Sequence, residues 1–124
     1  MGLKRIRVAF PTKGDKGLED TVSYVFGRAE YFTVIDLTDG AIDKVEVVKN
    51  PATSYEHGAG PIVAKMLADM HVNAVAAREM GPGVSTLLEQ SNIERLDVEA
   101  DTLLKDAVNV VLKYLEARMR TFQI

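Results

Sequence analysis

The chain has 124 residues, of which 15 are basic and 18 acidic, giving a formal net charge of −3 at pH 7. A chain of this length forms one domain around one core, and its 47% apolar and 27% charged residues exclude the disordered and fibrous classes. The absence of cysteine excludes disulfides and thiolate-bound zinc or iron–sulfur sites, and the negative balance removes the positive field that attracts nucleic acid.

No apolar run approaches the ~20 residues of a membrane span, and the apolar part of the N-terminal MGLKRIRVAF is too short for a signal-peptide core. We therefore expect residues 1–124 to form a single cytoplasmic domain. Neither a membrane nor nucleic acid is an expected partner.

The first half of the chain predicts three strands. Residues 5–10 alternate basic and apolar residues and then become fully apolar, as in a strand entering a buried sheet. Residues 11–28 are rich in glycine and polar residues and predict a long, mobile loop with at most one helical turn. Strands follow at 30–37 and 41–48, and the Asp39-Gly40 pair between them is typical of a hairpin turn.

The middle of the chain predicts a helix and a buried strand. Asn50-Pro51 ends the third strand, because proline cannot extend the ladder. Apolar residues then recur at helical spacing over 61–70, with Pro61 suited to the first helical position. The apolar run at 73–77 is typical of a central strand covered on both faces.

The last third predicts two more helices around a short strand at 93–97. Gly81-Pro82-Gly83 opens one helix, for which Asn92 is a plausible stop. Asp101 is the expected N-cap of the other. The strongest amphipathic stripe in the chain lies on this final helix and consists of Leu103, Leu104, Ala107, Val108, Val111, Leu112 and Leu115.

These elements predict an α/β fold in three layers. Two hairpin connections followed by right-handed crossovers give a mixed five-stranded sheet of order 3-2-1-4-5, numbered along the chain, with only the second strand antiparallel to the others. This topology resembles the ribonuclease H-like fold.

In such a sheet four loops meet at one edge: 11–17, Gly27-Arg28, 50–60 and 78–83. Open α/β sheets usually bind ligands outside the carboxyl ends of their strands. Two helices also begin there behind glycines, so that free N–H groups and positive helix ends favour an anion. His57 is the side chain in these loops that can ligate a metal, whereas His71 follows a helix at the opposite edge and is interpreted as structural.

Four stretches occur together in the chain: VFGRAEYF at 25–32, NPAT at 50–53, HGAG at 57–60 and GPGV at 81–84. Their order and spacing resemble the dinitrogenase iron–molybdenum cofactor biosynthesis family, over nearly the whole chain. The resemblance implies a nitrogenase accessory factor-like domain with a ribonuclease H-like fold. It also implies that such a domain binds or carries the iron–molybdenum cofactor or an iron–sulfur cluster, in exchange with a cluster-assembly protein.

The resemblance assigns a cofactor-binding set by matching motif positions. Its members are Gly27, Arg28, Asn50, His57, Gly58, Gly60, Gly81 and Gly83, with His57 also the candidate metal ligand. One position departs from the family, since cofactor-binding members carry His-Phe-Gly where this chain has Val25-Phe26-Gly27. The histidine expected as a cluster ligand is therefore absent, and the ligand chemistry of the pocket is altered.

Three classes of function are left open. The first is a small binding or carrier protein for a metallocluster or another small anion. The second is an enzyme, but a nuclease of this fold needs an acidic residue on the central strand, and Val8-Ala9-Phe10 supplies none. The third is a regulatory or assembly protein that docks a partner through the same edge. We expect a non-enzymatic binder.

Overall fold

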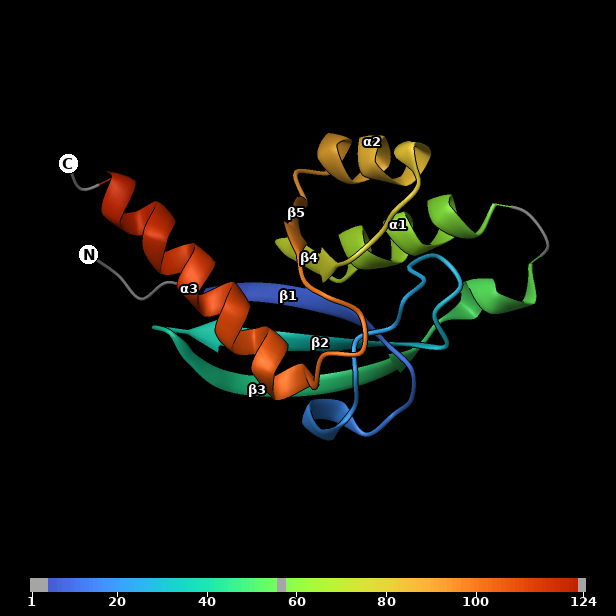
Figure 1. Cartoon of the computed structure of the whole chain (residues 1–124). Coiled ribbons are helices and arrows are strands. Elements are labelled where there is room, and N and C mark those ends of the chain that lie inside the picture. The colour runs from blue at the N-terminus through green and yellow to red at the C-terminus, as the bar shows by residue number, and fades with distance from the viewer. Residues whose placement is uncertain (1–4, 56–57, 123–124) are drawn as a thin grey trace.

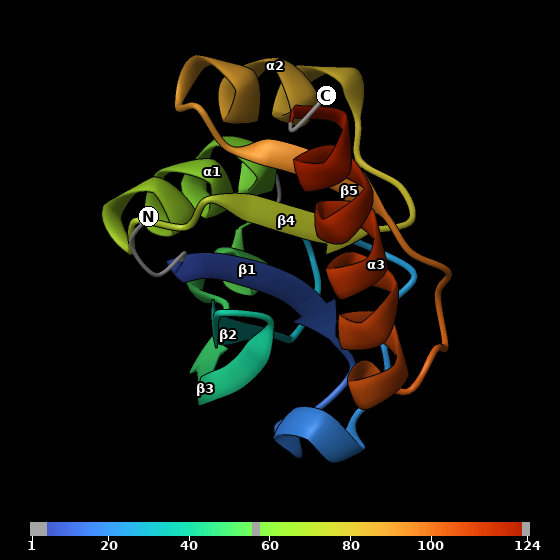
Figure 2. The same ribbon diagram turned by 90° about the vertical axis from the view of Figure 1, so that its left-hand side faces the viewer.

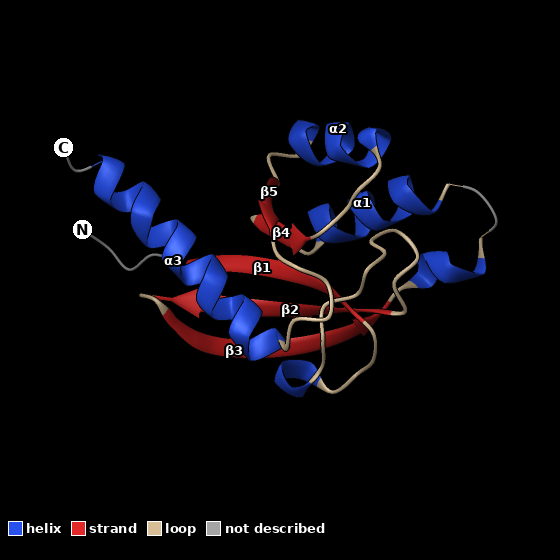
Figure 3. Cartoon of the chain, in the orientation of Figure 1, coloured by secondary structure: helices blue, strands red, loops and turns tan. Residues whose placement is uncertain are grey.

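The computed structural model describes residues 5–55 and 58–122. Strands and helices alternate along the second half of the chain, whereas the first half is a three-stranded meander (Figure 3). The elements are β1 (Arg5–Thr12), η1 (Gly17–Glu19), β2 (Tyr31–Thr38), β3 (Ala41–Lys49), η2 (Pro51–Ser54), α1 (Ala59–Asp69), β4 (Ala74–Ala77), α2 (Pro82–Gln90), β5 (Glu94–Asp97) and α3 (Leu104–Phe122).

The predicted sheet is confirmed. Its strand order is β3-β2-β1-β4-β5, in which β2 is antiparallel to both of its neighbours and β1, β4 and β5 are parallel. Between β2 and β3, Asp39 and Gly40 have φ angles of 53° and 81°, the left-handed pair that a two-residue hairpin turn of the predicted kind requires. β1 runs two residues further than predicted, because Pro11 and Thr12 still pair with β2.

Two cores lie on opposite faces of the sheet. Figures 1 and 2 show α1 and α2 on one face and α3 on the other. Side chains alternate between the faces along β1, so that Ala9 packs toward α1 and α2 while Val8 and Phe10 pack toward α3. The three-layer arrangement follows from this alternation, because each face of the sheet is apolar and has to be covered.

α1 begins earlier than predicted. The helix starts at Ala59, so Pro61 occupies its third position and not its first. A proline is tolerated throughout the first turn, where its missing N–H has no partner within the helix. α2 agrees with the prediction, with Pro82 at its first position and Asn92 in the left-handed conformation two residues after its end.

The prediction that Asp101 caps α3 is wrong. Asp101 has a φ of 65°, its N–H donates to Val22 O at 2.8 Å, and its carboxylate pairs with Lys13. The segment before the helix is paired with the loop that follows β1, so the helix can begin only at Leu104. There the Asp20 carbonyl accepts the N–H of Leu104 at 2.8 Å and takes one of the free donors that a side-chain cap would have satisfied.

The loop after β1 is anchored more firmly than its glycines suggest. The buried carboxylate of Asp20 accepts hydrogen bonds from the N–H groups of Gly14, Lys16 and Thr21 at 2.8–3.1 Å. Burial alone would raise the pKa of Asp20, but these hydrogen bonds together lower it. Val22 is fully buried, so the loop has an apolar anchor that its composition did not predict.

At the other end of the sheet, Asp36 joins three elements. Its carboxylate accepts from Arg7 Nε at 2.7 Å and from Arg5 at 3.1 Å, while Arg7 also donates to the carbonyl of Met70 at the end of α1. The hydrogen bond from Arg7 lowers the pKa of Asp36, burial opposes this and Arg5 adds to the lowering. The ion cluster thus ties β1 and β2 to α1.

Two leucines of α3 test the buried stripe. Leu104 is fully buried, whereas Leu112 is half-buried and borders a cavity. Leu104→Ala should lower the free energy of unfolding by about 2–5 kcal/mol, and Leu112→Ala by less, since solvent already reaches part of its side chain. Urea denaturation measures both losses. A larger loss for Leu112→Ala than for Leu104→Ala would show that the buried face of α3 is assigned wrongly.

The Asp36 cluster should make stability depend on pH. A carboxyl group whose pKa is lower in the folded state stabilises the fold above its unfolded pKa of ~3.9, and this contribution is lost as pH falls through the folded value. Asp36→Asn should therefore reduce stability at pH 7 and flatten its decline below pH 4. Asp15→Asn, at an exposed site, is the control. Equal acid profiles for Asp36→Asn and the parent would contradict the assignment.

Candidate functional site

Three of the four predicted loops come together at one edge of the sheet, on the right-hand side of Figure 1, whereas the loop after β1 leads into η1, which packs against α3 and β3. A methyl group placed on Gly27 would lie 3.7 Å from the backbone N of Gly60, and one placed on Gly60 would lie 2.4 Å from Cγ2 of Val84. The loop before β2, the start of α1 and the start of α2 are therefore neighbours. This contact requires glycine at position 60, because a side chain there would overlap α2.

Both helices present open N-termini at this edge. The N-cap positions are Gly58 and Gly81, and no side chain of the described residues caps either helix. The first N–H groups of an α-helix have no partner within the helix, and the positive end of the helix dipole lies there. Within each first turn the prolines supply no N–H, so the donors belong to their neighbours: Ala59, Gly60, Gly83 and Val84.

A cavity of about 390 Å³ lies between these loops and α2. Apart from one carboxylate and one phenol, its walls are apolar side chains and glycine. The lining residues are Tyr24, Val25, Phe26, Gly27, Glu79, Met80, Gly81 and Val84. Two of the predicted site residues, Gly27 and Gly81, are among them, and Val25 occupies the wall at the position where the resemblance implies a histidine.

Asn50 supports this wall from behind. Its side chain is buried, with Nδ2 donating to the carbonyls of Gly27 at 2.9 Å and Ala29 at 2.8 Å, and with Oδ1 accepting from Ala52 N at 2.9 Å. Asn50 thus positions the loop and does not itself line the cavity, so its predicted contact with a cofactor stays a prediction. Phe26, which precedes Gly27 in this loop, is also buried, and its ring packs edge-on against Phe32 with centroids 5.3 Å apart.

The predicted glycines fall into two groups. Gly58 has a φ of 80° and Gly60 touches α2, so the fold itself requires both. Gly81 and Gly83 have neither a left-handed φ nor any atom within 4 Å of where a side chain would begin. The fold does not need glycine there, and its presence leaves backbone N–H groups open to close approach by a ligand.

The predicted metal ligand His57 lies outside the described residues. Among the residues that are described, no group of three or more histidine, cysteine or acidic side chains is placed to hold a metal. The cavity offers Glu79, Met80 and Tyr24 as donors, a set that does not fit a cluster needing several protein ligands. Arg28, exposed and next to Gly27, remains a predicted contact.

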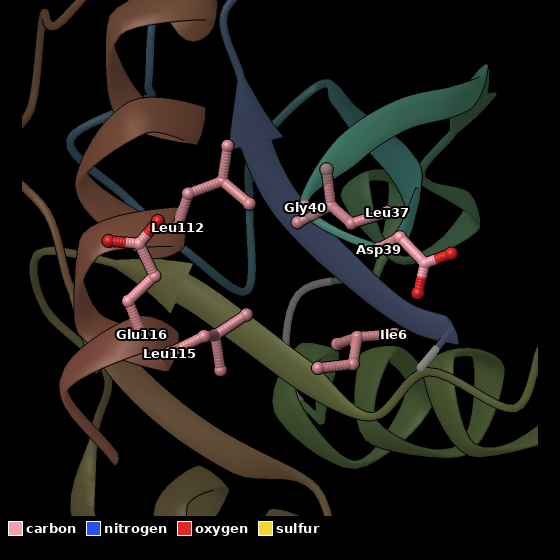
Figure 4. A pocket seen from close by; sticks show the side chains of 7 residues that line it. All are labelled: Ile6, Leu37, Asp39, Gly40, Leu112, Leu115 and Glu116. Atoms are coloured by element: carbon pink, nitrogen blue, oxygen red, sulfur yellow. The ribbon is translucent and has the colours of Figure 1, made fainter. Parts of the chain in front are cut away.

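A second cavity, of about 320 Å³, lies under α3 at the opposite end of the sheet. Figure 4 shows Ile6, Leu37, Leu112 and Leu115 around the space, while the carboxylates of Asp39 and Glu116 point away from it. The sequence pattern did not predict this cavity, which arises where the apolar stripe of α3 continues toward the end of the sheet. Because no polar group points into it, it is unsuited to an anion.

The fold is thus a small α/β domain with a candidate site at one edge of its sheet. A model of the dinitrogenase iron–molybdenum cofactor family matches residues 4–114, and the chain belongs to this family of small cofactor-binding or accessory proteins. An uncharacterised protein from Methanocaldococcus jannaschii is 26% identical over 121 residues, or 98% of this chain and 95% of the relative. Within the described residues, no helix is long and apolar enough to cross a membrane.

Solved structures share the fold. The apo form of the orange protein from Desulfovibrio gigas is 28% identical, with a TM-score of 0.78 over 86% of this chain and 87% of that chain. The NMR structure of a Thermotoga protein, provisionally described as a NifB protein, is 31% identical with a TM-score of 0.70, over 87% and 88% of the two chains. The dinitrogenase family suggested by the motifs is thus confirmed.

The two groups of glycines predict effects of different size on stability. Gly60→Ala should push α1 and α2 apart and lower the free energy of unfolding by about 1–3 kcal/mol. Gly81→Ala should change it by less than about 0.5 kcal/mol, since the added methyl group meets open space. Urea denaturation of both variants is the measurement. A Gly60→Ala variant as stable as the parent would show that the helices are not in contact.

Proposed function

We propose that this protein is a non-catalytic carrier that holds an anionic ligand, with a metallocluster as its cargo, between the N-termini of α1 and α2. The observation that carries the proposal is the contact of Gly60 with Val84, which brings two uncapped helix N-termini side by side. The start of α2 lines the cavity, and the start of α1 adjoins it through this contact. An anion held there would lie close to the positive ends of both helices.

The walls of the cavity favour a weakly hydrated anion. The side chains of Val25, Phe26, Met80 and Val84 offer no hydrogen bonds to replace those of water, so a small oxyanion loses part of its hydration there at a cost. A larger anion with a sulfide surface loses less on entering, and a thioether is a suitable neighbour for it. The family description, which names the iron–molybdenum cofactor, supports a metal–sulfur cluster of this kind.

The cluster keeps its own ligands, and the protein binds it through contacts that do not coordinate its metal atoms. Backbone N–H groups at the starts of both helices contact it, Arg28 adds positive charge, and His57 is a further predicted contact. Val25 forms part of the wall without coordinating. The Desulfovibrio gigas structure of this fold was determined as an apo form, which fits a domain that exists with and without its ligand.

The buried acidic groups of the described chain give no support to catalysis. Asp20 and Asp36 are each occupied by several hydrogen bonds that stabilise the fold. The central strand β1 presents Val8, Ala9 and Phe10 and thus lacks the carboxylate that a nuclease of this fold would use. A binding function does not require a free carboxylate at any of these positions.

A second candidate function is docking of a cluster-assembly protein at the same edge. Tyr24, Val25 and Tyr55 are 63%, 48% and 52% exposed, and all three lie in the loops that meet there. Exposed tyrosines beside a cavity are typical of protein interfaces. Complex formation without any small ligand would favour this function over cluster carriage.

Affinity for anions tests the proposed site. Tetrathiomolybdate, a compact molybdenum–sulfur dianion, should bind more tightly than molybdate or phosphate, and added salt should weaken the binding. Arg28→Ala should weaken it by about 2- to 5-fold, the equivalent of ~0.5–1 kcal/mol, whereas Lys113→Ala on α3 should not. Calorimetric titration measures these affinities. Equal affinities for all three anions would contradict the role of the apolar walls.

The dependence on pH tests the role of His57. If a protonated His57 contacts the anion, affinity should rise as pH falls through ~6.5, the ordinary histidine range, and His57→Ala should abolish this trend. A metal coordinated by neutral His57 would give the opposite trend, because a proton competes for the same nitrogen. The same titrations repeated across pH distinguish the two.

A further inference from the structure

The outer wall of the cavity is a short exposed span between two buried residues. Tyr24 and Val25 are 63% and 48% exposed, while Ser23 before them and Phe26 after them are 6% and 3% exposed. Both exposed residues line the cavity. Their positions therefore depend on how the two ends of the span are fixed.

The Phe26 end is fixed by its ring contact with Phe32 and by the hydrogen bond from Asn50 to Gly27. At the other end, the N–H of Ser23 donates to the carbonyl of Pro11 at 2.7 Å and so joins the span to the end of β1. Val22, fully buried, donates from its N–H to Thr102 O at 2.9 Å. Backbone contacts thus hold the span up to Ser23.

Beyond Ser23 the restraint comes from its side chain. Ser23 Oγ accepts a hydrogen bond from the N–H of Val25 at 3.2 Å and closes a tight turn over Tyr24. Without this acceptor the N–H of Val25 would lose its partner and the turn could open. Ser23 itself does not line the cavity, and neither the motifs nor the spacing of the sequence singled it out.

We infer that Ser23 is a positioning residue for the binding cavity, whose hydroxyl fixes the turn that presents Tyr24 and Val25 to the ligand. The inference rests on the proposed anion-binding function of this cavity. A wall ordered before binding does not have to be ordered by the ligand, so the hydroxyl contributes to affinity without touching the ligand.

Three variants test the inference by two measurements, the affinity for tetrathiomolybdate and the hydrogen-exchange rate of the Val25 amide. Ser23→Ala should weaken affinity by about 2- to 10-fold, the range of one net hydrogen bond, and should speed the exchange. Ser23→Thr retains the hydroxyl and should restore both. Thr33→Val is the matched control, because it removes a buried hydroxyl that bonds Thr12 Oγ1 at 3.0 Å inside the sheet. It should leave both values unchanged.

The two proposals fail in distinguishable ways. A parent protein that binds none of the anions overturns the proposed function, and the Val25 exchange rate then still reports whether Ser23 holds the turn. A parent that binds, with Ser23→Ala binding equally well, overturns the positioning role alone. If Thr33→Val weakened the affinity as much as Ser23→Ala does, the effect would come from a general loss of stability. That result would also overturn the positioning role of Ser23.

Discussion

The missing side chain at Gly60 is the constraint on which the rest of the site depends. A methyl group at this position would lie 2.4 Å from Val84, so the two helices can approach only because residue 60 is glycine. Their approach places two helix N-termini side by side, where one alone would be an ordinary surface feature. The electrostatic character of the edge is thus a consequence of packing, and it needs few charged side chains.

The remaining parts of the structure hold this arrangement in place. The sheet fixes where the loops leave, and Asn50 fastens the loop before β2 through the carbonyls of Gly27 and Ala29. Asp20 and Val22 fasten the loop after β1 to the start of α3. The loops at this edge are therefore bound to the core by buried polar groups, which allows small residues such as Gly81 to remain open toward the cavity.

The sheet and its order could be predicted because they depend on patterns that run over whole elements. Alternation along β1 and the stripe on α3 each involve many residues, and the Asp39-Gly40 turn has few alternatives. The start of α3 could not be predicted in the same way. Asp101 has the composition of an N-cap, but its backbone pairs with Val22, some eighty residues earlier in the sequence, and only the folded chain shows that pairing.

The edge at which the glycine-rich loops lie was predictable for a similar reason. The glycines and their edge follow from the topology and from the family motifs. The support from Asn50 depends on hydrogen bonds to distant parts of the chain, and that proposed for Ser23 depends on one bond within an irregular turn. Those bonds leave no periodic signal. The second cavity, beneath Leu112, could not be predicted, because the apolar stripe of α3 does not show where the sheet beneath that helix ends.

The most direct test of anion binding between the two helices is an amide titration of the labelled protein with tetrathiomolybdate, followed by NMR. Charge placed at open helix N-termini polarises the N–H groups that point to it. The account predicts the largest shifts at the amides of Ala59, Gly60, Gly83 and Val84. Shifts confined to the far cavity around Ile6, Leu37 and Leu115, with these four amides unchanged, would contradict it.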